Sequence, residues 1–426
     1  MHPGLEAADG KMRAAGVPDA AREAFARRFE RLVAGDSGAI HGDELEPVRE
    51  VPALDALPPA GEAPLDRAVV IKLNGGLGTS MGLHGPKSLI DVKPGVTFLD
   101  VIVRQVLALR DRHGARLPLV LMDSFSTRGA TLDALAAYPD LSCGDLPLDF
   151  LQSMEPKLLA HDLTPVEWPA DPGLEWAPPG HGDIYTSLAG SGILEALLER
   201  GFEYAFVSNS DNLGAVLDPR ILAWLAHERL PFLMEVVEGG PGDRKGGHIA
   251  RRDGRLILRE TAQAPEGDDS FGDHERWRFY NTNNLWISLP ALADRGRALD
   301  LPLIVNHKTV DPSDPGSPEV VQLETAMGAA VGAIDGAAAL QVPRTRFAPV
   351  KTTNDLLVVR SDAYVLREDD AHVEPAPERA GMEPPFVDLD PRFYKLLDDF
   401  EARFPCGPPS LLRAERLVVR GDVRFG

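Results

Sequence analysis

Cysteine and long apolar segments are both scarce in this chain of 426 residues. The two cysteines, Cys143 and Cys406, lie far apart and form no CxxC or Cys/His metal spacing, which favours a reducing compartment and argues against a structural zinc site. The most apolar long segment, 326–340, consists mainly of alanine and glycine and is too short to span a bilayer. No basic stretch followed by an apolar core opens the chain, so we expect no secretory signal and a cytoplasmic protein.

Basic charge is also in deficit. The chain has 44 lysines and arginines against 65 aspartates and glutamates, which gives a formal net charge of −21. Such a field repels nucleic-acid backbones and anionic membranes, so neither is expected as a partner. An anionic substrate would instead require a local cluster of lysines or arginines that reverses the sign of the potential at its site.

Strands and helices alternate through most of the sequence. One amphipathic helix is expected at 19–34, followed by an extended connector rich in proline, alanine and glutamate at 46–65. The alternation that follows predicts a mostly parallel sheet covered by helices on both faces. Strands are expected at 68–71, 117–122, 204–208, 232–237 and 356–359, helices at 97–112, 130–137, 187–199, 222–228, 319–333 and 391–404, and a hairpin at 249–259.

The first of these strands runs directly into a glycine-rich loop, KLNGGLGTSMGLHGPKS at 72–88. Five glycines in eleven positions allow backbone N–H groups to approach an anion closely. The Walker phosphate loop does not fit, because Pro86 and Met81 occupy positions where it requires glycine. This argues against a phosphotransferase that uses the loop in that way. The dinucleotide fingerprint fails as well, because its last glycine comes one residue too late.

The loop closely resembles the nucleotide-binding loop of the eukaryotic-type UTP–glucose-1-phosphate uridylyltransferases. The related N-acetylhexosamine uridylyltransferases carry an arginine after the threonine, whereas Ser80 and Met81 follow Thr79 here, which favours the glucose branch. The resemblance implies a Rossmann-like, GT-A-like α/β nucleotidyltransferase fold with a mostly parallel or mixed sheet flanked by helices and a short C-terminal extension. It also implies nucleotide binding by Leu73, Asn74, Gly75 and Gly76.

Further motifs of the family follow in the family's order. In FLQ (150–152), the resemblance implies that the amide of Gln152 reads the uracil edge, which an amide suits because it both donates and accepts. In PPGHGD (178–183), it implies that Gly180 contacts the nucleotide and that His181 donates to a phosphate oxygen. In SNSDN (208–212), at the end of a predicted strand, it implies that Asn209 binds substrate and that Asp211 holds Mg²⁺ beside the nucleotide phosphates.

The remaining motifs concern the sugar and the phosphates. The segment NTNNLW (281–286) is dense in amides, which suit sugar hydroxyls. The resemblance implies that Asn281 and Asn283 bind the sugar, and Glu260 is a candidate acceptor for a hydroxyl. Lys308 lies in Asn-His-Lys where the family commonly has Asn-Pro-Lys, and it is expected to bind substrate. Lys351, in the segment 342–356, matches the family's phosphate-facing lysine.

The implied reaction joins UTP to a sugar 1-phosphate and releases pyrophosphate. The attacking phosphate oxygen is already an anion, so the protein must chiefly hold two polyanions in contact and neutralise charge in the transition state. We expect Lys87, Lys351 and Mg²⁺ on Asp211 to do this. Galactose 1-phosphate or an N-acetylhexosamine phosphate is an alternative substrate, and a non-catalytic UDP-sugar sensor is an alternative function.

The similarity divides the chain into three segments. These are an N-terminal helical segment and linker (1–64), a catalytic nucleotidyltransferase domain (65–367) and a short C-terminal segment (368–426). Eukaryotic members continue past a Gly-Asp-Val-x-Phe-Gly string into a C-terminal β-helix that mediates oligomers, whereas Gly421 to Gly426 close this chain. We therefore expect a monomer or a weak dimer.

Overall fold

The chain is divided between two units, each built from three separate segments. A computed structural model describes residues 2–59, 61–83, 85–295 and 299–426, so His84 of the glycine-rich loop lies outside the described residues. Unit 1 comprises Met1–Ala63, Phe150–Ala205 and Arg220–Val342, and unit 2 comprises Pro64–Asp149, Phe206–Pro219 and Pro343–Gly426. The predicted boundary at residue 64 lies close to a unit boundary. The division into three functional segments itself stays a prediction.

Unit 1 contains a mixed sheet. Strand β11 (Phe232–Glu238) pairs antiparallel with β14 (Phe279–Ser288) and parallel with β17 (Ala338–Gln341). Strand β12 (His248–Arg252) pairs with β14, with β13 (Arg255–Arg259) and with the short β1 (Glu46–Pro47). Most residues of β11 and β14 are buried, as in a sheet with both faces covered. The helices of this unit's α/β part are α5 (Ile184–Gly190), α6 (Ile193–Glu199), α7 (Pro219–Glu228, which begins at the last residue of a unit 2 segment), α8 (Leu289–Arg295) and α9 (Ala330–Ala333).

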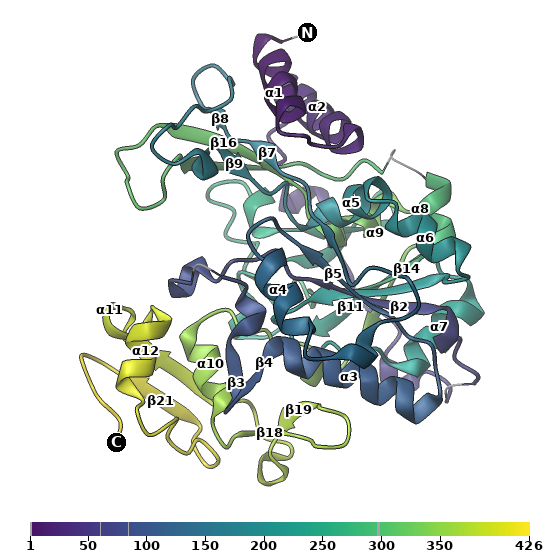
Figure 1. The fold of residues 1–426 in the computed structure, drawn as a ribbon, viewed down its shortest axis with the longest axis vertical. Coiled ribbons are helices and arrows are strands. Elements are labelled where there is room, and N and C mark those ends of the chain that lie inside the picture. Colours follow the sequence, from purple (N-terminus) through teal and green to yellow (C-terminus); the bar gives the residue numbers. More distant parts are fainter. Residues whose placement is uncertain (1, 60, 84, 296–298) are drawn as a thin grey trace. The chain divides into compact units, whose positions relative to one another are not determined.

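A second, antiparallel sheet in unit 1 carries the N-terminal helices. It consists of β15 (Ile304–Thr309), β16 (Glu319–Glu324) and β8 (Leu158–Leu159), with β7 (Glu155–Pro156) and β9 (Trp176–Ala177) nearby in the chain. Helices α1 (Pro3–Ala14) and α2 (Asp19–Val33) lie beside this sheet (Figure 1). Phe25 and Phe29 of α2 are buried with Leu158 and Leu323, so this contact is an apolar core of its own.

Unit 2 begins with the strand that carries the glycine-rich loop. Strand β2 (Ala68–Leu73) pairs in parallel with β5 (Leu119–Asp123). Along the chain, β2 and β5 are separated by β3 (Asp91–Lys93), β4 (Val96–Thr97) and helix α3 (Phe98–His113). A reciprocal capping box between Thr97 and Asp100 closes the N-terminus of α3. Helix α4 (Arg128–Leu135) follows β5. The chain passes between the units within β6 (Asp149–Leu151) and β10 (Tyr204–Asn209).

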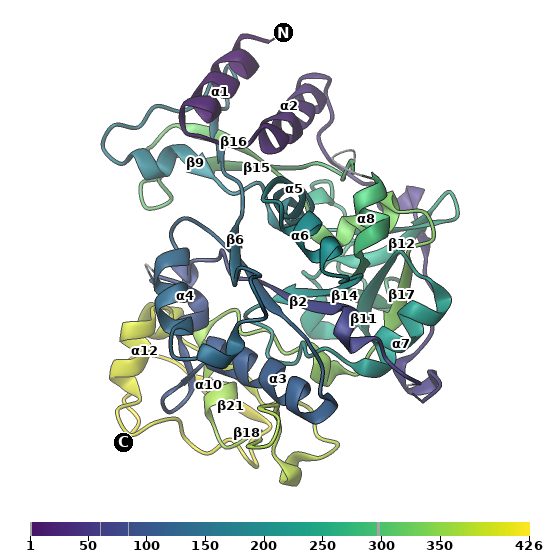
Figure 2. The ribbon, with the colours of Figure 1, turned by 45° about the vertical axis from the view of Figure 1, so that its right-hand side comes forward.

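The C-terminal segment of unit 2 packs into the same core as the segment around β3 and α3. Tyr394, Phe400 and Phe404 are buried together with Val92 and Phe98. Figure 2 shows the C-terminal elements α10, α12, β18 and β21 close together in space. The elements are α10 (Thr353–Arg360), β18 (Tyr364–Leu366), β19 (Val373–Pro375), β20 (Phe386–Leu389), α11 (Pro391–Tyr394), α12 (Leu397–Arg403) and β21 (Arg416–Val419).

The predicted fold class is confirmed, since the chain has a mixed sheet flanked by helices, but four predicted elements are wrong. Residues 319–333 are not one helix, because 319–324 form β16, where the β-branched Val320 and Val321 pair with β15. Residues 356–359 are not a strand, because a capping box between Thr352 and Asp355 starts helix α10 ahead of them.

The other two wrong elements are helices that the structure divides. The predicted helix 187–199 is interrupted at Gly192, which has φ +78° and separates α5 from α6. The predicted helix 391–404 is likewise divided into α11 and α12. Helix α1 was not predicted at all. In the described part of the chain, no helix combines the length and the apolar character needed to cross a lipid bilayer.

Candidate active site

Unit 2 brings together two lysines and one carboxylate from three distant motifs. Lys87 Nζ lies 2.8 Å from Asp211 Oδ2, and Lys351 Nζ lies 3.8 Å from the same oxygen. The side chains of Lys87 and Asp211 are 15% and 13% exposed, whereas that of Lys351 is 59% exposed. Two ammonium groups on one carboxylate leave a local excess of positive charge in an acidic protein. An anionic substrate requires a local cluster of positive charge in so acidic a protein, and these lysines form one.

The end of β10 is fastened to the segment that carries Lys351. The N–H of Val350 donates to the main-chain oxygen of Asp211 at 3.0 Å. The buried amide of Asn212 donates to Arg346 O at 3.0 Å and accepts the N–H of Ala348 at 3.0 Å. Gly214 permits this approach, because a Cβ there would lie 2.2 Å from Thr345 O. Lys351 therefore reaches Asp211 because of contacts that bind the two segments together.

The glycine-rich loop lies next to this cluster through the backbone. The N–H of Ser210 donates to Leu73 O at 3.1 Å, and the N–H of Lys87 donates to Gly76 O at 3.4 Å. Gly75 is half-buried and Gly76 is exposed, so their main chain is open to a ligand. Of the predicted nucleotide-binding residues in unit 2, Leu73, Gly75, Gly76 and Asp211 are thus neighbours, and the substrate-binding candidate Asn209 ends β10 two residues before Asp211.

Asn74 is held differently from the rest of the loop. Its side chain is 2% exposed and donates to Asp123 Oδ1 at 2.8 Å and to Thr131 Oγ1 at 3.0 Å. Its N–H donates to Met122 O at 2.8 Å. The amide of Asn74 is therefore used inside unit 2, where it fixes the point at which β2 gives way to the loop.

One oxygen of Asp211 suits a divalent cation. Oδ2 faces the lysines, whereas Oδ1 is buried and has no hydrogen-bond partner among the described residues. Within the same residues, no group of three or more His, Cys, Asp or Glu side chains is arranged to hold a metal ion. Mg²⁺ is often bound by one or two carboxylates together with substrate phosphates, so a single carboxylate fits this cation.

In unit 1, the predicted sugar-binding asparagines form a hydrogen-bonded pair on a bulge of β14. Asn281 Nδ2 donates to Asn283 Oδ1 at 2.9 Å, and the N–H of Asn283 donates to Asn281 Oδ1 at 2.9 Å. Asn283 has φ +59°, a left-handed conformation that asparagine adopts more readily than most residues. The pair is thus a preformed set of amides with fixed orientation.

His181 lies at the start of a 3-10 turn, His181–Asp183, with its ring orientation fixed. Its Nδ1 accepts the N–H of Met327 at 2.8 Å, so the neutral imidazole carries its proton on Nε2. Gly180, with φ +77°, precedes it, and a Cβ there would lie 2.5 Å from Thr325 O. The close approach of Thr325 therefore requires glycine at 180, the residue directly before His181.

Glu260 and His181 are both linked to the asparagine pair. The N–H of Asn281 donates to Gly247 O at 2.9 Å, and a methyl group on Gly247 would lie 2.6 Å from Glu260 Oε2. A methyl group on Gly328, next to Met327, would lie 2.8 Å from Asn281 Nδ2. These contacts join the predicted sugar and phosphate ligands of unit 1 into one group.

Lys308 and Gln152 are attached to the same group through intermediates. Lys308 Nζ donates to Gln322 Oε1 at 3.0 Å and lies 3.6 Å from Glu324 Oε1. The N–H of Ser153, next to Gln152, donates to Asp183 Oδ2 at 2.6 Å. Burial raises the pKa of Asp183, although hydrogen bonds from Ser187 and Ser153 oppose this rise. Gln152 itself is half-buried.

Sequence reasoning missed several residues that hold the candidate site residues in place. Asp183 lies inside the quoted PPGHGD motif, so its position beside His181 was a usable signal. Asp123 and Glu235 are fully buried carboxylates at the base of the glycine-rich loop and of the asparagine bulge, respectively. Each lies in or at the end of an apolar strand, and no local pattern distinguishes such a residue from a solvent-facing one.

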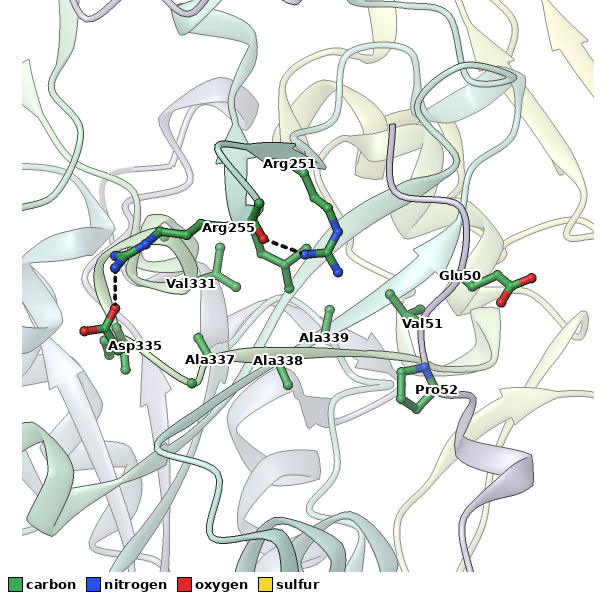
Figure 3. Close-up of a pocket in the computed structure, with 15 residues that line it drawn as sticks. Glu50, Val51, Pro52, Arg251, Arg255, Val331, Asp335, Ala337, Ala338 and Ala339 are labelled. Atoms are coloured by element: carbon green, nitrogen blue, oxygen red, sulfur yellow. Dashed lines mark hydrogen bonds and ion pairs between the residues drawn. The ribbon is translucent and has the colours of Figure 1, made fainter. Parts of the chain in front are cut away.

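A cavity of about 330 Å³ in unit 1 contains none of the predicted residues (Figure 3). Its floor is formed by small side chains such as Ala338 and Ala339. Its two arginines are engaged locally, because Arg251 donates to Gly254 O at 2.9 Å and Arg255 pairs with Asp335 at 2.9 Å. The cavity is therefore separate from the candidate site.

A mixed α/β fold with a glycine-rich loop and a lysine–carboxylate cluster at strand ends is that of a nucleotidyltransferase. The family model described as "UTP--glucose-1-phosphate uridylyltransferase" matches residues 22–426. A relative of that name from Solanum tuberosum is 42% identical over 417 residues, which cover 95% of this chain and 85% of the relative. The chain belongs to the UTP–glucose-1-phosphate uridylyltransferase family, which confirms the predicted resemblance.

Solved structures agree. A mutant of UDP-glucose pyrophosphorylase from Leishmania major, in complex with UDP-glucose, is 45% identical with a TM-score of 0.93, and the match covers 100% of this chain and 92% of that one. A UDP-glucose phosphorylase from Trypanosoma brucei is 45% identical with a TM-score of 0.92, covering 99% and 92%.

Proposed function

We propose that this chain transfers the uridylyl group of UTP to glucose 1-phosphate, forming UDP-glucose and pyrophosphate in a reversible reaction. Membership of the family supports the substrates. The observation that carries the proposal for this particular chain is the convergence of Lys87 and Lys351 on Asp211 beside the glycine-rich loop. A sensor that had lost the chemistry would have no need of this cluster.

The chemical step is an in-line displacement at phosphorus. An oxygen of glucose 1-phosphate forms a bond to the α-phosphorus of UTP, and the bond from that phosphorus to the bridging oxygen of the β-phosphate breaks. Pyrophosphate leaves with the electron pair, and no proton need move because the nucleophile is already an anion. The protein lowers the barrier by bringing the polyanions together and by neutralising negative charge on the oxygens around phosphorus.

Lys87 and Lys351 supply this neutralisation in unit 2. Lys87 is largely buried and held by Asp211, so it is a fixed charge, whereas the more exposed Lys351 can turn toward a phosphate. Mg²⁺, when bound, adds positive charge at the phosphate oxygens, and Asp211 Oδ1 is the protein atom that would hold it. The N–H groups of Gly75 and Gly76 are available to the nucleotide.

The unit 1 residues supply mainly hydrogen bonds from neutral groups, with Lys308 and Glu260 as charged exceptions. The Nε2–H of His181 donates to a phosphate oxygen, and the amide of Gln152 pairs with the uracil edge beside the main chain of Gly180. Asn281, Asn283 and Glu260 bind sugar hydroxyls. Lys308 binds a substrate phosphate. In unit 2, Asn209 is the remaining residue proposed to contact substrate.

A pyrophosphate-release assay tests the proposal directly. UTP is offered with glucose, galactose and N-acetylglucosamine 1-phosphates, and ATP, GTP and dTTP replace UTP as nucleotide controls. We expect the highest kcat/KM with UTP and glucose 1-phosphate. A preference for another sugar 1-phosphate would support the alternative, a uridylyltransferase for that sugar. No pyrophosphate release with any pair of substrates would overturn the proposed activity. Cytoplasmic location and a monomeric or weakly dimeric state stay predictions. Cell fractionation tests the location, and size-exclusion chromatography tests the oligomeric state.

A further inference from the structure

We infer that Glu235 is a positioning residue for sugar binding, because it holds the bulge that presents Asn281 and Asn283. This inference rests on the proposed function for the role of the asparagine pair. Glu235 is in the middle of β11 and is 0% exposed, so it does not itself contact a substrate. It acts through the residues of β14 opposite it.

Three hydrogen bonds from β14 end on Glu235. Trp286 Nε1 donates to Oε1 at 2.9 Å, and Asn284 Nδ2 donates to Oε2 at 2.9 Å. The hydroxyl of Thr282 donates to the main-chain oxygen of Glu235 at 2.8 Å. Each carboxylate oxygen thus has a neutral donor, and all three donors come from the strand that carries the asparagine pair.

The register of the two strands shows what these hydrogen bonds do. Met234 faces Leu285 and Val236 faces Asn281, so Glu235 alone lies opposite the three residues 282–284. Those three residues form the bulge, and a bulge leaves residues without partners in the strand ladder. Thr282 and Asn284 are tied to Glu235, which leaves Asn283 at φ +59° to face its partner Asn281.

A buried carboxylate in an apolar sheet is costly unless its oxygens are hydrogen-bonded. An aliphatic side chain would pack in β11 without that cost, but it would leave the N–H groups of Trp286 and Asn284 without an acceptor. The carboxylate accepts from both at once, with one oxygen for each donor. The geometric gain is the fixed orientation of the asparagine pair.

Steady-state kinetics of two Glu235 variants test the inference. Glu235→Ala removes both acceptors, and we expect the KM for glucose 1-phosphate to rise about tenfold while the KM for UTP changes less than about threefold. Glu235→Gln keeps an acceptor for Trp286, and its NH₂ can donate to Asn284 once that amide has turned. We expect this conservative variant to restore the KM for glucose 1-phosphate to within about threefold of the wild-type value.

Val237→Ala is the matched control, because Val237 is a buried residue of the same strand whose aliphatic side chain cannot form a hydrogen bond with the bulge. A loss of packing alone would move both KM values by similar factors in this control and in Glu235→Ala, and that result would overturn the inference. An unchanged KM for glucose 1-phosphate in folded Glu235→Ala would overturn it as well.

A binding measurement separates this inference from the proposed activity. Calorimetric titration of the folded full chain with UDP-glucose and with UDP measures the contribution of the sugar without turnover. We expect Glu235→Ala to reduce the advantage of UDP-glucose over UDP and Glu235→Gln to keep it. If Glu235→Ala does not fold, Trp286→Phe removes one of the two donors and should weaken the same advantage to a smaller extent. No change in that advantage would overturn the inference, whereas absence of turnover in the wild-type chain would overturn the proposed activity alone.

Discussion

Unit 2 and unit 1 carry site residues of opposite chemical character. In unit 2, two ammonium groups share one carboxylate, so the candidate residues are charged. In unit 1, the candidate residues are mainly amides and an imidazole, and hydrogen bonds within the protein fix the orientation of these side chains. Charge suits groups that must stabilise a transition state, whereas oriented neutral groups suit the discrimination of hydroxyls and a base edge. Variants of the unit 2 cluster should therefore lower kcat, and variants of the unit 1 asparagine pair should raise KM.

Lys351→Ala should have the largest effect. Loss of a charge that stabilises the phosphorus transition state should lower kcat on the order of 10²-fold or more, with an unchanged circular-dichroism spectrum. Lys395→Ala, at an exposed lysine of the same unit, is the control and should leave kcat unchanged. A kcat near the wild-type value in Lys351→Ala would remove Lys351 from the chemical step.

Removal of divalent metal should have a similar effect. EDTA should abolish pyrophosphate release, because without Mg²⁺ the lysines neutralise only part of the phosphate charge. Added Mg²⁺ should restore the release. In Asp211→Asn, restoration should require a higher Mg²⁺ concentration, since the buried Oδ1 loses its charge. Full activity in EDTA would contradict the assignment of Asp211 to a metal.

Asn283→Gly should have a moderate effect confined to the sugar. Glycine adopts φ +59° without strain, so this variant removes the amide and leaves the bulge intact. We expect the KM for glucose 1-phosphate to rise about 3- to 10-fold, the range of one or two lost neutral hydrogen bonds. The KM for UTP, measured on the same preparation, is the internal control. A lower kcat with both KM values unchanged would reverse the comparison between the units.

Asp123→Asn should change stability rather than activity. Burial raises the pKa of Asp123 to about 6, and Asp149 adds to this rise. The unfolded carboxyl has a pKa of about 4, so between about pH 4 and pH 6 the folded state keeps a proton that the unfolded state has lost. The free energy of unfolding contributed by this group therefore falls as the pH rises through that window and stays low above it.

Asparagine at 123 can still accept from Asn74 and carries no charge. We expect this variant to raise the free energy of unfolding by roughly 1–3 kcal/mol at pH 7 and by much less at pH 4. Urea unfolding at both pH values measures the difference, and Asp133→Asn, at an exposed position in α4, is the control. Equal effects of Asp123→Asn at the two pH values would show that ionisation of Asp123 is not the cause.

Local signals in the sequence account for the elements that were predicted correctly. The apolar run of β2, the glycine-rich loop and the Asp253-Gly254 hairpin turn each follow from a few adjacent residues. The predictions for 319–333 and 356–359 were wrong because they relied on the apolar pattern alone. That pattern reveals neither the strand pairing of the first segment nor the helix capping ahead of the second. Pairing with β15 decided the first segment, and a capping box decided the second.

The candidate site was predictable only in part. The resemblance predicted functional roles for Lys87, Asp211 and Lys351, and the structure brings these three together in unit 2. No spacing in the sequence shows that Asn212 joins their segments or that the amide of Asn74 is used internally. Such contacts depend on tertiary packing, so they become visible only in three dimensions.

A double-mutant cycle on Lys87 and Lys351 tests whether the two lysines act as one unit on Asp211. The kcat values of Lys87→Ala, Lys351→Ala and the double variant are compared with that of the wild-type chain. We expect the double variant to fall about as far as the more damaged single variant, on the order of 10²- to 10³-fold. Losses that multiply, to about 10⁴-fold or more, would show that the lysines act independently and would contradict a shared charge cluster.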